Sequence, residues 1–75
     1  MSAQERKRKN DLLCRYIKSK LIMCNYSKQE LATMLHMSLA SVYTRLKNPD
    51  TFTRKELHII YHGLQFTADE ILQVE

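Results

Sequence analysis

A hydroxyl residue followed three places later by glutamate occurs three times in the later part of the chain. The pairs are Ser27 with Glu30, Thr53 with Glu56, and Thr67 with Glu70. In such a capping box the hydroxyl accepts a hydrogen bond from the third amide of a helix, while the carboxylate accepts one from the amide of the hydroxyl residue. Each pair opens a segment with helical apolar spacing, so the pattern predicts a succession of short helices.

Apolar spacing and stop signals predict five helices. The expected helices are residues 10–24, 28–35, 39–47, 54–62 and 68–73. Ser38 can cap the third helix, Pro49 disfavours a helical residue before it, and Gly63 can supply the left-handed residue that often ends a helix. Residues 47–52 form the only expected loop. Glycine and proline occur once each among 75 residues, which predicts one compact all-α domain.

Positive charge gathers at the amino terminus. Seven Lys and Arg residues but only two acidic residues lie between positions 1 and 20, whereas the whole chain carries +4. We therefore expect a basic amino-terminal arm, residues 1–9, ahead of a domain of residues 10–75. A basic arm suits a polyanion, because binding phosphates releases counterions, although a solvated, frayed terminus would have the same composition. The arm residues expected to contact phosphate are Arg6, Lys7, Arg8 and Lys9.

The second and third expected helices are separated by a very short turn. Two short helices joined in this way can place the second in a DNA major groove, which admits one α-helix. Val42 and Leu46 are expected to be buried, and they fix the rotation of the third helix. The residues that then share its outward face are Ala40, Tyr43, Thr44 and Lys47.

Residues 26–72 resemble the Cro and phage-repressor type of helix-turn-helix, often called XRE-like. The resemblance is carried by SKQELA at 27–32, LHMS at 35–38 and SVYTRLKNP at 41–49, followed by FTRKEL at 52–57. Ala32 stands where the family has a small residue at the helix crossing. Two positions depart from the pattern: His36 replaces the usual glycine of the turn, and Arg45 stands where many members bury an apolar side chain.

The resemblance implies a compact, five-helix, lambda-repressor-like domain and assigns roles to its residues. Its base-contacting positions correspond to Ser38, Leu39, Ala40, Tyr43 and Thr44, of which Ser38 is better placed as a cap. Lys28 falls at a phosphate-contacting position, and Arg45 could reach phosphate or cover the core edge. Lys47, Asn48, Thr53 and Arg54 would flank the backbone. The base-facing set lacks the Gln, Asn or Arg that makes bidentate base contacts, so it predicts no operator sequence.

This resemblance implies a sequence-specific regulator of transcription, encoded by a phage or prophage and acting by operator occupancy. One domain offers little interface, so we expect a homodimer on a palindromic site. We expect its interface on the last helix and the end of the fourth, where the apolar residues serve either the core or the interface: Leu64, Phe66, Ile71, Leu72 and Val74. The competing hypothesis is a protein-interaction module on the same fold, antitoxin-like or inhibitor-binding, whose apolar tail binds a foreign partner.

Other classes of site find little support in the sequence. His58 and His62 have a metal-compatible spacing without a third ligand, so we expect a surface pair and no metal. Cys14 and Cys24, about 15 Å apart along one helix, should be reduced packing residues. We find no catalytic motif and no apolar run long enough to span a bilayer. We therefore expect a cytoplasmic non-enzyme without cofactor, small-molecule ligand or membrane contact.

Overall fold

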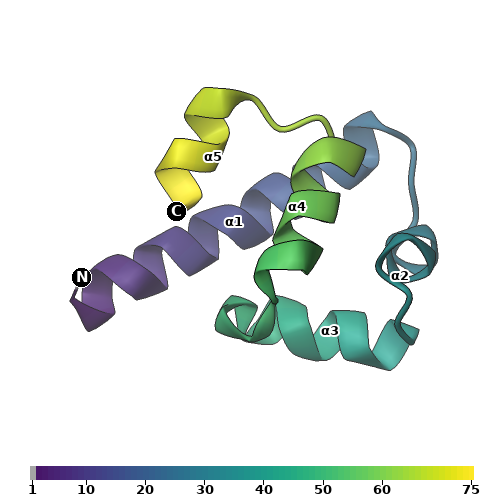
Figure 1. The fold of residues 1–75 in the computed structure, drawn as a ribbon, viewed down its shortest axis with the longest axis horizontal. Helices are drawn as coiled ribbons and strands as arrows, with labels where there is room; N and C mark the ends of the chain where they lie inside the picture. The colour runs from purple at the N-terminus through teal and green to yellow at the C-terminus, as the bar shows by residue number, and fades with distance from the viewer. Residues whose placement is uncertain (1) are drawn as a thin grey trace.

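The computed structural model describes residues 2–75, which form α-helices and one 3-10 turn without any strand. The elements are α1 (Ala3–Met23), α2 (Lys28–Leu35), α3 (Leu39–Lys47), η1 (Pro49–Thr51), α4 (Arg54–Gly63) and α5 (Ala68–Val74) (Figure 1). The predicted all-α class with five α-helices is confirmed for this part of the chain. None of these helices combines the length and the apolar character that crossing a membrane requires.

The predicted start of the first helix at residue 10 is wrong. The helix begins at Ala3, and the Ser2 hydroxyl caps it by accepting a hydrogen bond from the Glu5 amide at 3.2 Å. Ser2 and Glu5 repeat the hydroxyl and glutamate spacing that marks the other helix starts, so the signal for this boundary was present in the sequence. The basic residues expected on an arm therefore lie on the first turns of α1, and Met1 lies outside the described residues.

The other helix starts agree with their predicted caps. Both hydrogen bonds of the capping box are present at the starts of α2, α4 and α5. The Ser38 hydroxyl accepts from the Ser41 amide at 3.1 Å and caps α3. Local hydrogen bonds between near neighbours thus set these boundaries, which is why a sequence pattern could find them.

Gly63 does not supply the left-handed residue expected after α4. It lies inside α4, and the positive φ beyond this helix belongs to Gln65, at 59°. A Cβ at position 63 would lie 2.9 Å from the sulfur of Met34 on α2. The glycine therefore serves the close approach of two helices.

The core is built from all of these elements. Its fully buried side chains include Ile17, Leu31, Val42, Ile60 and Leu64. Residues 47–52, expected to be a loop, also contribute, because Pro49 at the start of η1 and Phe52 directly after it are buried. The Thr51 hydroxyl donates to the Asn48 carbonyl at 2.7 Å and holds this turn.

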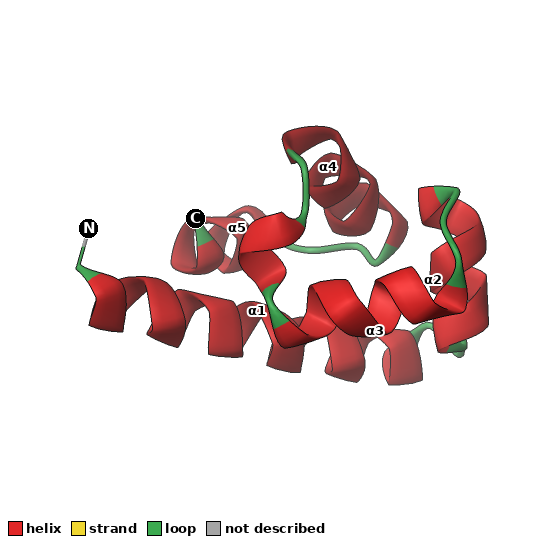
Figure 2. Cartoon of the chain, turned by 90° about the horizontal axis from the view of Figure 1, so that it is seen from below, coloured by secondary structure: helices red, strands yellow, loops and turns green. Residues whose placement is uncertain are grey.

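The longest element, α1, lies along one side of the molecule (Figure 2). In Figure 1, α1 slopes across the molecule, α4 crosses it, and α5 lies near its first half. The end of α3 that is close in sequence to η1 lies toward the amino-terminal half of α1, whereas α2, seen end-on, lies at the opposite side (Figure 1). Packing contacts join α1 with α5 and η1, and α2 with α3 and α4.

A buried ion pair that the sequence analysis did not foresee ties α1 to α5. Lys20, only 9% exposed, places its ammonium 2.7 Å from the Glu70 carboxylate. The same ammonium lies 5.3 Å from the centre of the Phe66 ring. Fifty positions separate the two partners, so no local pattern could indicate the pair.

Candidate nucleic-acid interface

The turn between α2 and α3 consists of three residues and depends on a left-handed backbone at His36. His36 has φ 55° and ψ 45°, the left-handed conformation expected at the turn position where the resemblance implies glycine. The amides of His36 and Met37 donate to the carbonyls of Thr33 and Ala32 at 3.2 and 3.0 Å. These bonds satisfy the last carbonyls of α2, while the left-handed conformation costs a non-glycine residue about 1 kcal/mol.

The rotation of α3 agrees with the prediction. Val42 is fully buried and Leu46 is 9% exposed, so both belong to the core. The residues on the opposite side, Ala40, Tyr43, Thr44 and Lys47, are all exposed. Figure 2 views the molecule from the side of α3 and shows this helix in front of the other elements. This outer face is open to solvent, and a helix exposed in this way has room to enter a groove.

Two of the expected base-contacting residues, Ser38 and Thr44, use their hydroxyls in local hydrogen bonds of α3 and its cap. Ser38 accepts from the Ser41 amide and donates to the Ser41 hydroxyl at 3.0 Å, so it acts as a cap. The Thr44 hydroxyl donates to the Ala40 carbonyl at 3.0 Å. Leu39 is half-buried at the start of the helix. Of this set, Tyr43 is the large side chain with a free face, and it is 49% exposed.

Lys28 contacts the outer face of α3 from the neighbouring helix. Its ammonium lies 5.5 Å from the centre of the Tyr43 ring, within the range of a cation–π interaction. Lys28 was expected to contact phosphate, and no local sequence pattern indicates its contact with Tyr43. The pair depends on the crossing of α2 and α3, where Ala32 is fully buried and lets the helices approach.

Arg45 packs against α4. Its Nε lies 3.2 Å from the Glu56 carboxylate, and its side chain is only 28% exposed. The Nε atom is buried without an aligned hydrogen-bond acceptor, whereas Nη2 of the same guanidinium donates to the Glu56 carboxylate at 3.5 Å. Of the two roles considered for Arg45, the structure favours covering the edge of the core over reaching phosphate.

The remaining residues of the expected phosphate set lie near the two ends of η1. Lys47 and Asn48 are exposed at the end of α3, and Thr53 caps α4. Arg54 is exposed but pairs with the Glu75 carboxylate, a contact that raises the pKa of the guanidinium. Arginine is charged with or without this contact, so the pairing limits its reach and leaves its charge unchanged.

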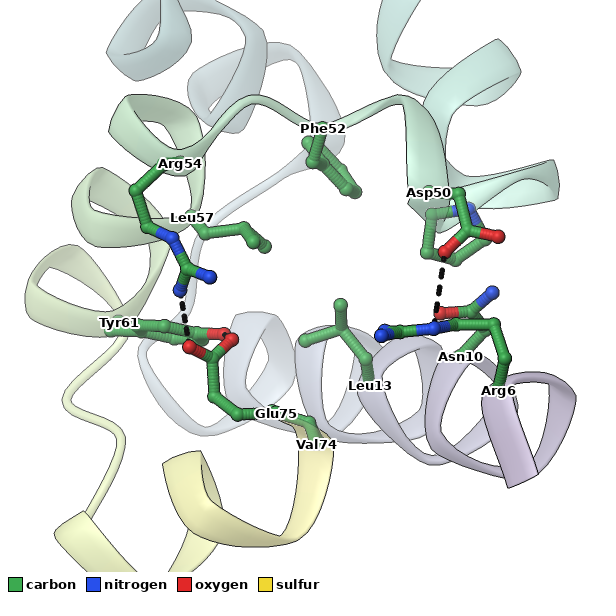
Figure 3. Close-up of a pocket in the computed structure, with 11 residues that line it drawn as sticks. Arg6, Asn10, Leu13, Asp50, Phe52, Arg54, Leu57, Tyr61, Val74 and Glu75 are labelled. Carbon is green, nitrogen blue, oxygen red and sulfur yellow. Dashed lines mark hydrogen bonds and ion pairs between the residues drawn. The ribbon is translucent and has the colours of Figure 1, made fainter. Parts of the chain in front are cut away.

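Glu75 also contacts a buried tyrosine. The Tyr61 hydroxyl donates to its carboxylate at 2.8 Å. Burial, and then this hydrogen bond, raise the pKa of Tyr61 far above its usual range. Figure 3 shows Arg54, Tyr61 and Glu75 on one side of a pocket and the ion pair of Arg6 with Asp50 on the other. The sequence analysis missed this arrangement, because its members come from α1, η1, α4 and the end of the chain.

The residues expected at a dimer interface divide into two groups. Leu64 is fully buried and Val74 is 4% exposed, so both belong to the core of the monomer, which corrects their assignment to an interface. Phe66 and Ile71 are half-buried, and Leu72 is 72% exposed. Only the last three can contribute to a surface patch.

The histidines and cysteines form no cluster in the structure. Among residues 2–75 no three His, Cys, Asp or Glu side chains are placed to hold a metal ion together. The rings of His58 and His62 stack with their centres 6.4 Å apart. Both cysteines carry free thiols; that of Cys14 donates to the Leu46 carbonyl at 2.9 Å, and burial raises its pKa.

Comparison of the chain with protein-family models, curated proteins and solved structures finds no match. The resemblance to the Cro and phage-repressor type therefore rests on the residues quoted for it.

Proposed function

We propose that this protein is a sequence-specific, double-stranded-DNA-binding regulator of transcription, similar to Cro or a small phage or prophage repressor. The observation that supports this most directly is the outer face of α3. On this face Ala40, Tyr43, Thr44 and Lys47 are exposed, whereas Val42 and Leu46 on the inner side of the same helix are buried. A three-residue turn precedes the helix. An exposed helix held in this way has the form that major-groove recognition requires.

Charge around α3 suits the phosphates of a duplex. Lys28 begins α2, Lys47 ends α3, and α1 carries Arg6 and Lys7 in its first turns. Phosphate contacts would position α3, whereas the outer face would select the sequence. With Ala40, Tyr43 and Thr44 as its central residues, that face would read thymine methyl groups and accept or donate single hydrogen bonds.

The regulator would act by occupying an operator as a homodimer. One α3 reads too few base pairs for tight, specific binding, so two copies related by two-fold symmetry would bind half-sites about one helical turn apart. Binding over a promoter would then block polymerase. The residual apolar patch of Phe66, Ile71 and Leu72 is the proposed contact between the copies.

Selection of bound duplexes from a random pool with the purified chain tests the function. The expected result is enrichment of a palindrome whose half-sites lie about 10 base pairs apart. No enrichment after repeated rounds would contradict the proposal.

Replacing single residues of the outer face tests how the sequence is read. Thr44→Ala should reduce the preference for the selected operator over random duplex by about 3- to 10-fold, because one apolar base contact disappears. Competition titrations with the two duplexes measure this preference, and the melting temperature should change little. Equal losses on both duplexes would contradict a reading role.

The chain contains a matched control for this substitution. Thr33 on α2 is also exposed and also donates to the carbonyl four residues earlier, at 3.1 Å. Thr33→Ala therefore removes the same local hydrogen bond away from α3 and should leave the preference unchanged. Tyr26, 40% exposed, serves in the same way as the control for Tyr43→Ala.

The second candidate is a protein-interaction module, and exposed apolar side chains outside α3 support it. Ile22, Met23 and Leu72 are each more than 70% exposed. If these side chains bind a foreign protein, their replacement by lysine should abolish that binding. In that case the unaltered chain should also select no palindrome from the random pool. The two experiments separate the candidates.

A further inference from the structure

A groove separates the amino-terminal half of α1 from the end of α3. Its walls are formed by Ala3, Lys7 and Asn10 on one side and by Lys47 and Asn48 on the other. The Cys14 thiol joins the two walls by donating to the Leu46 carbonyl. We call this feature the α1–α3 groove.

The groove lies next to the outer face of α3. Lys47 belongs both to that face and to the groove. The slope of α1 brings its first turns toward the level of α3, whereas its last turns rise away (Figure 1). Seen from the side of α3, the first turns of α1 continue past the end of this helix (Figure 2). A duplex seated on α3 would therefore pass over the groove.

The charged side chains of the groove favour an anion. Lys7, 81% exposed, lies 3.5 Å from the Asp11 carboxylate, and Arg6 lies 3.7 Å from Asp50. Exposed ion pairs of this kind contribute little stability, so a phosphate can displace their carboxylates at small expense. Lys47 pairs with no acidic side chain of residues 2–75. The groove is lined by three cations, Arg6, Lys7 and Lys47, and by the two carboxylates of Asp11 and Asp50, so its net charge is positive.

The other basic residues of α1 face elsewhere. Arg8 and Lys9 line a separate depression together with Leu12 and with Gln73 of α5. A helix turns successive side chains to different sides, so four neighbouring cations cannot all reach one duplex. The basic cluster of the sequence is thus divided by the structure.

We infer that the α1–α3 groove binds the DNA backbone beside the recognised major groove, with Lys7 and Lys47 contacting phosphate oxygens and Asn10 and Asn48 available to donate to them. Arg8 and Lys9 make no such contact. This inference rests on the proposed function and specifies which part of α1 serves it. It replaces a diffuse basic arm with one rigid phosphate site.

The dependence of DNA affinity on salt concentration tests the assignment. Each phosphate contact contributes about 0.9 to the slope of log affinity against log salt. Lys7→Ala and Lys47→Ala should each reduce the slope by about that amount. Lys9→Ala and Arg8→Ala, which remove the same charge from the same region, should leave it unchanged on the selected operator.

The outcomes separate the inference from the function on which it rests. If the unaltered chain binds the operator while Lys9→Ala and Lys7→Ala reduce the slope equally, the assignment of phosphate binding to the groove is contradicted. The proposed DNA-binding function is then unaffected. An unchanged slope for Lys7→Ala also contradicts the assignment to the groove. If the unaltered chain binds no duplex, both the proposed function and the phosphate site in the groove are contradicted.

Nuclear magnetic resonance of the side-chain amides provides a second measurement without any substitution. On addition of the operator duplex, the amide signals of Asn10 and Asn48 should shift, and that of Gln73, on the α5 side, should not. Shifts at Gln73 with none at Asn10 would overturn the groove.

Discussion

Two residues of this protein have backbone conformations that are unusual for their residue type. His36 occupies the left-handed region, at φ 55°, where glycine is the usual choice. Gly63, the one glycine, lies inside a helix and serves close packing against Met34. A histidine thus adopts the left-handed conformation typical of glycine, while the glycine is helical. The packing of the neighbouring helices, as well as the residue type, decides the backbone conformation at both positions.

Replacing His36 by glycine should stabilise the fold. Glycine adopts the left-handed region without strain, although it loses more backbone entropy on folding, so the net gain should be about 0.5–1 kcal/mol. Thermal unfolding should show a midpoint raised by roughly 2–6 °C. Lys18→Gly, at an exposed position within α1, should lower the midpoint. A lower midpoint for His36→Gly would show that the histidine side chain contributes more than its strained backbone loses.

Elements in this molecule are positioned by contacts between helices that lie far apart in the chain. The capping boxes determine where α2, α4 and α5 begin, but where α2 meets α4 the Met34 side chain occupies the space that a Cβ at Gly63 would need. The approach of α2 to α3 likewise depends on the fully buried Ala32. Small residues at these crossings decide how closely the helices pack.

Gly63→Ala tests this packing. Alanine is about 1 kcal/mol better than glycine within a helix, but its Cβ would meet the Met34 sulfur at 2.9 Å. In the unaltered background the Met34 side chain must shift, and this shift should offset part of the gain in the free energy of unfolding. In a Met34→Ala background Gly63→Ala should stabilise by up to about 1 kcal/mol. Denaturant titration of the four chains measures the coupling, and additive effects would contradict the close approach.

At the scale of the whole molecule, the pair of Lys20 and Glu70 joins the first helix to the last. The hydrogen bond from Lys20, and then that from the Thr67 amide, lower the pKa of Glu70 below its ordinary 4.5. A carboxylate whose pKa is lower in the folded state stabilises the fold above its unfolded pKa. This stabilisation is lost as the pH falls from about 4.5 through the lower, folded value.

Glu70→Gln should remove this part of the pH dependence. Thermal midpoints measured between pH 7 and pH 3 should fall less steeply below about pH 4.5 for the variant than for the unaltered chain. The variant should also be less stable at neutral pH, because Lys20 would be left buried without its partner. Asp69→Asn, on the exposed neighbouring position, is the control, and parallel curves for all three chains would contradict the role of the pair.

Local interactions explain what could be predicted. The helix starts at positions 28, 39, 54 and 68, the burial of Val42 and Leu46, and the exposure of Ala40, Tyr43, Thr44 and Lys47 all follow from spacings of three or four residues. Hydrogen bonds of the caps and the period of the helix act over that range, so a sequence contains them in readable form.

Contacts between distant segments were decided by the tertiary structure alone. They include the ion pair of Lys20 with Glu70, the approach of Lys28 to Tyr43, and the burial of Leu64 and Val74 in the monomer. The division of the basic cluster of α1 between two sides of the helix belongs with them. Each depends on which faces meet when the helices pack, and helix packing selects among many arrangements that share the same local pattern.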